Sequence, residues 1–452
     1  MLGDHLWPCG NASASSKLAL STAKVFRRHR RQLLLASPVE NMLHPLTDEH
    51  IIAARAVDGL TDVIARHGLG RNLMLVCDDK TWVAIGQQIS VKFAPHFNFK
   101  AYSLGRNVHA TLAAAEELAA AADGYDGFLA VGSGTANDVT KYAATITDKP
   151  YISIATAASM NGYSSASASL LVNGFKQSYP ARPPKAVIAD LTVIAAAPKR
   201  LVRAGLGDTL CRSSVEVDVR MAHLLIGSPY PADIFELLRK HEPELISNAP
   251  KLRLNDINYY KTLMQVLLET GDLMAKTGSS AISSQGEHMI SHAVESIYGS
   301  ELHSVLHGEL IAVTTLTMGQ LQQRLMLKPF IVKSIPRSEA DFVRAFGKHA
   351  GPMLSVAYGG KVLSEEQVVE INAKVASDWN NIKQALTEIM VQPSVIERAF
   401  IQSGVPTQPS EIRVNEHRYQ SAVSYAYMAR DRFTFLDLNA MMESASHVRG
   451  KV

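Results

Sequence analysis

Short apolar runs and amphipathic stretches alternate along the sequence from about residue 50 to residue 200. RNLMLVCDD (71–79) predicts a buried strand that ends in two acids, and DGFLAVGSG (126–134) predicts a strand that ends in a glycine loop. Strands that alternate with helices of this length predict a parallel α/β sheet. The other predicted strands are FKAYSL (99–104), PYISIAT (150–156) and KAVIADLTVI (185–194), and the predicted helices are HIIAARAVDGLTDVIARHG (50–68), TWVAIGQQISVKF (81–93), TLAAAEELAAAA (111–122) and NDVTKYAATI (137–146).

The strand patterns stop after about residue 200, and long amphipathic helices follow. We therefore predict an α/β domain with a parallel sheet over residues 46–200 and an all-α domain over residues 201–452. The boundary lies near AAAPKRL, where the chain leaves the last predicted strand. The main predicted helices of the second domain are LVRAGLGDTLCRSSVEVDVRMAHLL (201–225), YYKTLMQVLLETGDLMAK (259–276), EHMISHAVESIY (287–298) and ELIAVTTLTMGQLQQRLM (309–326).

The formal net charge of +3 comes from the start of the chain. Residues 1–35 hold six basic residues against Asp4 alone, and without them 39 basic and 41 acidic residues remain, a net charge of −2. A body this close to neutrality carries no sign of a nucleic-acid partner. We expect residues 1–45 to be a disordered basic extension. A targeting peptide is the alternative, although the RRHRR cluster precedes only a short apolar QLLLA.

The three cysteines, Cys9, Cys77 and Cys211, include no CxxC pair, and their number is odd. Reduced thiols in a cytoplasmic protein are the interpretation that this usage favours. The sequence contains no run of about 18 apolar residues, so we predict no membrane span.

Gly132, Ser133 and Gly134 come directly after a predicted buried strand and before a predicted helix. Glycines at such a turn let the backbone approach a diphosphate, and the helix N-terminus favours anions. Asn137 and Asp138 suit the first turn of that helix. An ordinary strand-to-helix turn also explains a lone GSG, because the longer GxGxxG pattern is missing.

Two further features favour a dinucleotide ligand. Asp78, followed by Asp79, ends an earlier strand, where a carboxylate can bond the ribose hydroxyls of NAD and repel the 2′-phosphate of NADP. The small-residue stretch ATAASMNGYSSASAS (155–169) offers hydroxyl and amide donors near the same sheet edge. A flexible loop is the alternative for that stretch.

One acid and three histidines, Asp208, His288, His292 and His307, form a candidate metal site in the second half of the chain. Carboxylate oxygen and imidazole nitrogen suit a divalent metal, and three protein ligands leave a position for substrate. His288 and His292 are four residues apart, so they project from one helix face. Each residue alone has a simpler explanation. Asp208, predicted near the start of a helix, can pair with Arg212 four residues on, and the histidines can be surface residues.

Six segments together carry a resemblance to a known family, and they run from about residue 75 to residue 440. They are VGSGTANDVTKYAA, PYISIATAASMNGYSS, APKRLVRAGLGDTLCRSSVEVDVRMA, SQGEHMISHAVES, LHGELIAV and ARDRFTFLDL. The chain resembles sn-glycerol-1-phosphate dehydrogenases, within the group that holds glycerol dehydrogenases, iron-containing alcohol dehydrogenases and dehydroquinate synthases. The resemblance implies a dehydroquinate synthase-like fold, a nicotinamide cofactor, a divalent metal, and a homo-oligomer. Asp78 favours NAD as the cofactor, with NADP as the alternative.

The resemblance also implies a role for each matching residue. Asp208, His288 and His307 match metal ligands, and His292 matches a substrate-binding position beside the metal. Asn161 and Asp208 also match substrate contacts, and we predict that Asp208 and His292 are catalytic. With Asn137 and Asp138 included, the predicted cofactor contacts are Asp78, Gly132, Ser133, Gly134, Thr135, Ala136, Asn137, Asp138, Thr156, Ala157, Ala158, Ser159 and Ser165.

Three positions depart from the family's pattern. Asn161, in SMNG, stands where the family has an acid in SxDG, so a substrate contact keeps a hydrogen bond but loses a charge. The loop has GSG where GGG is commoner. Arg212 stands where lysine is usual, and the two are not equivalent where geometry matters.

The activity that this resemblance implies is the reversible, metal-dependent reduction of dihydroxyacetone phosphate to sn-glycerol 1-phosphate with NAD(P)H. Zinc is the expected metal, with nickel and iron as alternatives. Because of Asn161, a metal-dependent dehydrogenase of another phosphorylated or polyol ketone is the first alternative. A non-catalytic nucleotide-binding regulatory protein is the second. Dehydroquinate synthase is disfavoured because its first ligand is a glutamate where Asp208 stands. The spacing identifies no basic residue for the substrate phosphate.

Overall fold

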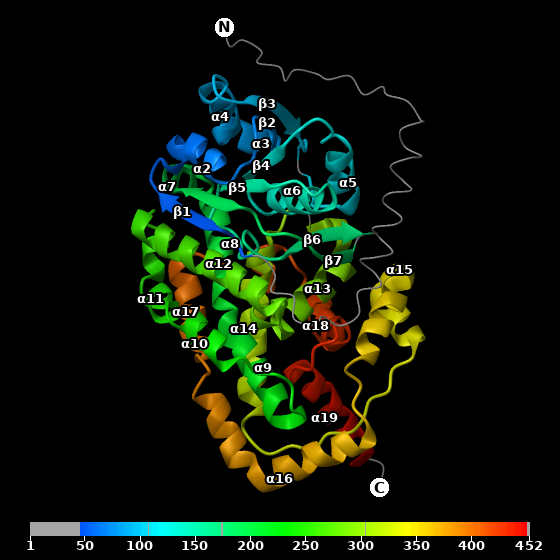
Figure 1. Cartoon of the computed structure of the whole chain (residues 1–452). Coiled ribbons are helices and arrows are strands. Elements are labelled where there is room, and N and C mark those ends of the chain that lie inside the picture. Colours follow the sequence, from blue (N-terminus) through cyan, green and yellow to red (C-terminus); the bar gives the residue numbers. More distant parts are fainter. Residues whose placement is uncertain (1–45, 107, 173–174, 303, 450–452) are drawn as a thin grey trace. The chain divides into compact units, whose positions relative to one another are not determined.

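The computed structural model describes residues 46–449 apart from residues 107, 173–174 and 303 (Figure 1). By their internal contacts the described residues belong to one compact unit. The predicted basic extension, residues 1–45, lies outside the described residues. The division into two domains at residue 200 stays a prediction.

Six strands form the predicted parallel sheet, in the order β1-β8-β5-β4-β2-β3. The central strands β4 and β5 are buried at every residue, as expected where helices cover both faces of a sheet. Because β5, β4 and β2 are neighbours, the turns after them meet at one sheet edge. The strands are β1 (Glu49–Ala53), β2 (Asn72–Cys77), β3 (Asn98–Ser103), β4 (Gly127–Gly132), β5 (Tyr151–Ala155) and β8 (Ala186–Asp190).

Short helices connect these strands, and most of the predicted ones are confirmed. Helix α6 contacts β4, β5 and β2, and its residues Val139 and Ala143 belong to the same apolar cluster as Phe128 of β4 and Tyr151 of β5. The helical segments are η1 (Ala56–Gly59), α2 (Leu60–Arg66), α3 (Asp79–Thr81), η2 (Trp82–Gly86), α4 (Gln87–Lys92), α5 (Leu112–Ala120), α6 (Gly134–Ile146) and α7 (Leu191–Ala196).

Two predictions were correct only in part, at strands β1 and β8. The predicted helix 50–68 begins as strand β1, and the predicted strand 185–194 ends as helix α7. Asp190 explains both changes, because its carboxylate accepts hydrogen bonds from the backbone N–H groups of Arg55, Val57 and Thr192. It thereby caps α7 and fixes the turn after β1.

A two-stranded hairpin of β6 (Ser167–Val172) and β7 (Phe175–Pro180) was not predicted. The strands pair antiparallel, with Leu171 opposite Lys176. The end of the small-residue stretch 155–169 therefore belongs to β6. In Figure 1 the hairpin lies between α6 and α13, and β7 contacts α13.

After α7 the described residues form helices and no strand, as predicted. The predicted helix 201–225 is divided into α8 and α9, which meet at Cys211. The segments are α8 (Lys199–Leu210), α9 (Arg212–Ile226), α10 (Ala232–Arg239), α11 (Glu242–Ser247), η3 (Ala249–Leu252), α12 (Ile257–Thr277), η4 (Ser280–Ile282), α13 (Gly286–Tyr298), η5 (Gly299–Leu302), α14 (His307–Leu325), α15 (Glu339–Gly359), α16 (Glu365–Thr387), α17 (Pro393–Ser403), η6 (Pro409–Ile412), α18 (Glu416–Tyr425), η7 (Ala426–Met428) and α19 (Phe435–Arg449).

Glycines let helix α8 approach its neighbours at backbone contact. A Cβ atom on Gly207 would lie 2.2 Å from the carbonyl oxygen of Gly308, and one on Gly308 would lie 1.9 Å from that of Ala204. On the other side of α8, a Cβ on Gly205 would lie 2.0 Å from the carbonyl oxygen of Ala158. Backbone atoms cannot turn aside as a side chain can, so these positions require glycine. The contacts bring the end of α8 against the start of α14 and against the loop after β5.

We expect Gly308→Ala to lower the free energy of unfolding by at least about 2 kcal/mol, because the added methyl group overpacks the α8–α14 contact. Denaturant unfolding measures this change. Gly359→Ala is the matched control, since nothing lies within 4 Å of a Cβ built there, and it should change stability by less than about 0.5 kcal/mol. Equal stability of the two variants would show that the contact is not needed.

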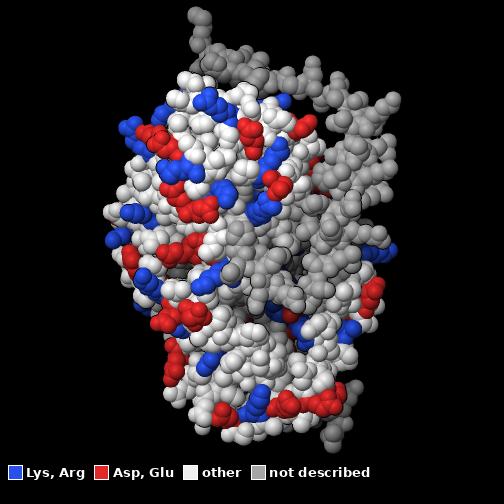
Figure 2. Space-filling view, in the orientation of Figure 1, with Lys and Arg blue, Asp and Glu red and all other residues white. Residues whose placement is uncertain are grey.

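Basic and acidic side chains are interspersed among the described residues on the face shown in Figure 2. This distribution agrees with the near-neutral charge of the chain outside residues 1–35. Among the described residues, no helix has both the length and the apolar character that crossing a membrane requires.

Candidate metal and cofactor site

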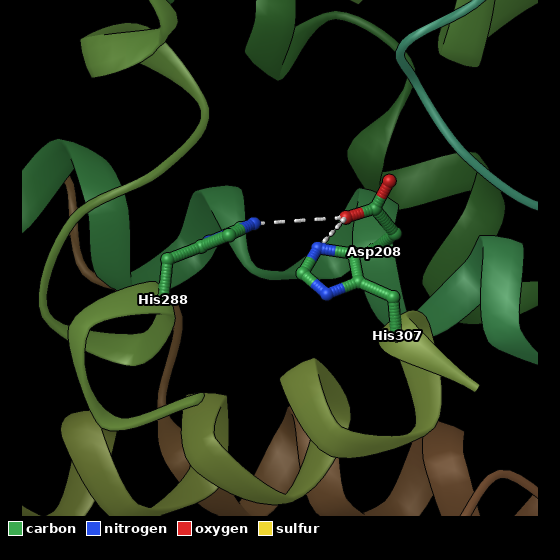
Figure 3. Close-up of side chains that lie close together, drawn as sticks. All are labelled: Asp208, His288 and His307. Carbon is green, nitrogen blue, oxygen red and sulfur yellow. Dashed lines mark ion pairs between the residues drawn. The ribbon is translucent and has the colours of Figure 1, made fainter. Parts of the chain in front are cut away.

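Asp208, His288 and His307 converge, as predicted, although they come from three different helices (Figure 3). Asp208 lies near the end of α8, and not near a helix start as the sequence indicated. His288 lies in the first turn of α13, and His307 is the first residue of α14. The Nε2 atoms of both histidines lie 3.9 Å from the same oxygen, Oδ1 of Asp208. Three ligand atoms therefore face one point.

The two oxygens of Asp208 have different surroundings. Oδ2 accepts a hydrogen bond from the backbone N–H of Asn161 at 3.0 Å. Oδ1 is buried and has no hydrogen-bond partner. Burial raises the pKa of Asp208, partly offset by His307 and by the Asn161 N–H. A buried carboxylate oxygen without a partner is costly, and a divalent cation between Oδ1 and the two Nε2 atoms removes that cost. The donor set therefore fits a metal.

Each histidine ligand has a carboxylate near its other ring nitrogen. Nδ1 of His288 lies 2.8 Å from Oε1 of Glu287. Because a carboxylate only accepts, this contact places the proton on Nδ1 and leaves the Nε2 lone pair for a metal. Nδ1 of His307 lies 3.9 Å from Oε1 of Glu295, a longer version of the same arrangement. Burial is the largest cause that lowers the pKa of both histidines, which favours the neutral form that binds metals.

A second group of metal-type side chains, Cys211, Glu287 and His288, overlaps the first. Its atoms already have partners. The Cys211 thiol donates to the carbonyl oxygen of Asp208 at 3.0 Å, and burial raises its pKa well above the usual value, so the thiolate is disfavoured. Oε1 of Glu287 accepts from the N–H of Gln285 as well as from His288. The set with Asp208 is therefore the better metal site.

His292 is buried one helical turn after His288, outside the group of three ligands. Burial lowers its pKa well below the usual value, and the nearby Arg430 and Lys176 lower it further. The ring is therefore neutral near pH 7. The predicted role of His292 as a substrate-binding residue stays a prediction.

The predicted glycine loop forms the turn from β4 into α6. Gly132 ends β4, Ser133 precedes the helix, and Gly134 begins it. A Cβ atom on Gly132 would lie 2.7 Å from Cβ of Ala136, so the turn requires glycine there. The Gly132 carbonyl accepts the N–H of Thr156, which joins this turn to the one after β5. Thr135 and Ala136 lie in the first turn of α6, so the predicted diphosphate residues form one helix N-terminus.

A buried lysine ties α6 to the small-residue loop 156–167. Nζ of Lys141 donates to the carbonyl oxygens of Gly162 and Ser167 and to the hydroxyl of Ser165, at 2.6, 3.1 and 3.0 Å. Asn137 is buried, and its amide group donates to the Gly162 carbonyl as well. These bonds fix the two turns relative to each other. Burial lowers the pKa of Lys141 to about 8.

The remaining predicted cofactor residues have the following positions. Asp138 is buried on α6, and burial raises its pKa to about 6. Ala157 and Ala158 are fully buried, and Thr156 and Ser165 nearly so, while Ser159 follows Ala158 in the same loop. Oδ1 of Asp78 accepts the N–H groups of Lys80 and Thr81 and caps α3. The cofactor role of all these residues stays a prediction.

Asn161 and Arg212, two of the three departures from the family pattern, lie on the same small cavity beside Asp208. The backbone of Asn161, rather than its side chain, bonds to Asp208. Arg212 pairs with Glu216 at 2.7 Å and with Glu242. The simple explanation of Asp208 as the helical partner of Arg212 is therefore wrong.

Sequence reasoning missed Glu287, Glu295, Lys176 and Arg430. Glu287 and Glu295 are on the histidine helix, one residue before His288 and three after His292, and this helical spacing was the available signal. Lys176 is on the unpredicted hairpin, and its Nζ lies 3.3 Å from Oε1 of Glu295. Arg430 lies in the matched segment ARDRFTFLDL and donates to the hydroxyl of Ser284.

Comparison with known proteins agrees with this arrangement. The model of a family described as iron-containing alcohol dehydrogenase matches residues 51–198. A glycerol-1-phosphate dehydrogenase (NAD(P)+) of Methanosphaerula palustris is 28% identical over 88% of this chain and 90% of its own length. The enzyme with the same name from Thermococcus sibiricus is 32% identical over 62% of this chain and 79% of its own length.

Solved structures share the fold at lower identity. A probable glycerol dehydrogenase from Sinorhizobium meliloti has a TM-score of 0.52 and 21% identity, over 80% of this chain and 98% of its own. A maleylacetate reductase from a Rhizobium species has a TM-score of 0.55 and 14% identity, over 86% of this chain and 92% of its own. At such identities the likeness concerns the fold alone.

The fold and the homologues define a metal-containing, NAD(P)-dependent alcohol dehydrogenase with a dehydroquinate synthase-like architecture. The identity and coverage of the match to the Thermococcus sibiricus enzyme identify the family within this class of dehydrogenases. The chain belongs to the glycerol-1-phosphate dehydrogenase family. This membership and the intact ligand set favour an enzyme over the non-catalytic regulatory protein considered from the sequence.

We expect Glu287→Gln to weaken zinc binding by about 10- to 100-fold, because His288 loses the carboxylate that orients its ring. Competition with a chromophoric chelator measures the affinity. Glu301→Gln is the matched control, since Glu301 is exposed and pairs with Arg418 at 3.0 Å rather than with a histidine ligand. If both variants bound zinc as the wild type does, Glu287 would have no orienting role.

Proposed function

We propose that this protein catalyses the reversible reduction of dihydroxyacetone phosphate to sn-glycerol 1-phosphate with NAD(P)H. The observation that carries the proposal is the convergence of two Nε2 atoms on the partnerless Oδ1 of Asp208. Relatives that cover most of this chain are named for the same reaction. In that reaction a hydride passes to the ketone carbon, a proton passes to its oxygen, and NAD(P)H is oxidised.

Asp208, His288 and His307 would hold the metal. When bound there, a divalent cation supplies Lewis-acid polarisation of a carbonyl oxygen. Zinc is the proposed metal, since a carboxylate and two imidazoles suit it, with nickel and iron as alternatives.

The other residues of the site bind, orient and move protons. His292 is neutral, so it is suited to orient a substrate hydroxyl or to relay a proton to the ketone oxygen. The turns after β4 and β5 would hold the cofactor diphosphate, and Asp78 at the end of β2 would contact the ribose and favour NAD over NADP. The bonds of Lys141 to the Asn161 loop support a rigid placement of cofactor and ketone together.

A dehydrogenase of another phosphorylated or polyol ketone is the second candidate, and Asn161 is the observation that favours it. An amide at this position keeps a hydrogen bond but removes the charge that the family has there. Its backbone N–H bonds to the carboxylate of Asp208, so a change at Asn161 acts beside one of the proposed metal ligands. The two candidates differ in whether the phosphate group matters.

We expect zinc-loaded protein to oxidise NADH with dihydroxyacetone phosphate at a kcat/KM at least about 100-fold above that for dihydroxyacetone, because the bonds of a phosphate group contribute roughly 3 kcal/mol. A panel of ketones at equal concentration, followed at the NADH absorbance, measures this ratio. Asp208→Ala gives the background rate of NADH oxidation, since it removes the carboxylate that both histidine ligands face. A faster reaction with an unphosphorylated polyol ketone would replace the proposed substrate by the second candidate.

A further inference from the structure

A lysine from the β6–β7 hairpin lies against the metal ligands. Nζ of Lys176 is 3.3 Å from Oε1 of Glu295 and 3.5 Å from Nδ1 of His307. His307 faces Asp208 with its other nitrogen. The ammonium group is therefore separated from the ligand atoms by one imidazole ring.

Lys176 makes fewer bonds than Lys141 and Lys361, two lysines whose side chains are buried. Lys141 donates to three oxygens, and Lys361 does the same with the carbonyls of Tyr427 and Arg432 and the carboxylate of Asp437. An ammonium group has three donors. Lys176 has one ion pair and one contact that is long for a hydrogen bond, and 24% of its side chain is exposed. The ammonium group of Lys176 therefore keeps N–H donors for a further partner, and a ligand can reach it from solvent.

The charge of Lys176 acts on the whole site. It acts to lower the pKa of Asp208, His292 and His307. Burial raises the pKa of Glu295, but Lys176 and the nearby histidines outweigh burial, so that the pKa of Glu295 lies well below its usual value. Arg430 is a second cation that lowers the pKa of His292. An anionic group beside His292 and His307 would therefore lie near Lys176 and Arg430, with the carboxylate of Glu295 paired to Lys176.

We propose that Lys176 binds the phosphate group of the substrate; this inference rests on the proposed function. The ketone oxygen would lie at the point that Asp208, His288 and His307 face. The phosphate ester begins at the carbon next to that ketone, so its charge must lie close to the ligands. Lys176 contacts the side chain of the ligand His307 and keeps donors for an anion. Lysine binds phosphate as a compact point charge.

A positioning role is the competing explanation, because Lys176 could serve only to neutralise Glu295 and thereby orient His307. The two roles give different results. Loss of a phosphate-binding residue weakens the binding of phosphorylated ketones and leaves the metal in place. Loss of a positioning residue lowers metal content and slows every ketone alike.

The test compares wild type, Lys176→Gln, Lys176→Arg and the control Lys185→Gln. Lys185 pairs with Asp48 at 3.2 Å on the surface, before β8. For Lys176→Gln we expect the KM for dihydroxyacetone phosphate to rise by about 10- to 100-fold, the size of a lost charge-assisted hydrogen bond. The KM for dihydroxyacetone and the zinc content should stay unchanged, and Lys176→Arg should recover part of the loss. Lys185→Gln should match wild type.

Calorimetry with inorganic phosphate gives a readout that does not depend on turnover. We expect zinc-loaded wild type to bind phosphate in competition with the substrate, and Lys176→Gln to bind it at least about 10-fold more weakly. Unchanged phosphate binding, or an equal loss on both ketones together with lost zinc, would overturn the assignment of Lys176. Wild type that showed no preference for the phosphorylated ketone would overturn the proposed function and this inference with it.

Discussion

The close crossing of α8 and α14 is the constraint on which the site depends. At Gly207 and Gly308 the two backbones touch, and any side chain would overlap a carbonyl oxygen. Asp208 follows Gly207, and His307 precedes Gly308, so the crossing itself brings an acid from one helix to a histidine from the other. Gly205 extends the contact to the loop whose Asn161 N–H bonds to Asp208. Glycines far apart in the sequence thus join the sheet edge to the ligand set.

Charged groups around this crossing are arranged in neighbouring pairs of opposite character. Glu287 and Glu295 lie near the Nδ1 atoms of His288 and His307, on the side of each ring that faces away from Asp208. Lys176 forms an ion pair with Glu295. Burial opposes the ionisation of Asp208 and of both histidine ligands. The result is neutral imidazoles whose Nε2 atoms face a carboxylate oxygen without a partner. A divalent cation satisfies all three atoms at once, which a hydrogen bond to water does less completely.

Much of this arrangement was predictable from the sequence. The alternation of apolar runs predicted five of the six strands of the sheet, and ligand chemistry with the family order predicted Asp208, His288 and His307. Other parts depend on contacts between distant residues. β1 is a strand because it pairs with β8, and Asp190 at the end of β8 accepts bonds from backbone N–H groups that precede it by over 130 residues in the sequence. Lys176 meets Glu295 and His307 only through the hairpin, whose serine-rich beginning resembles a loop. Such pairings leave no local periodicity to detect.

X-ray absorption at the metal edge of zinc-loaded protein tests the central claim most directly. The structure predicts a first shell of nitrogen and oxygen at about 2.0–2.2 Å, with the outer-shell scattering of two imidazoles. The overlapping group with Cys211 predicts one imidazole and a sulfur at about 2.3 Å instead. A light-atom shell with two imidazoles, reduced to one in His307→Ala, would agree with the Asp208 site. A sulfur neighbour, or a shell unchanged in His307→Ala, would contradict it.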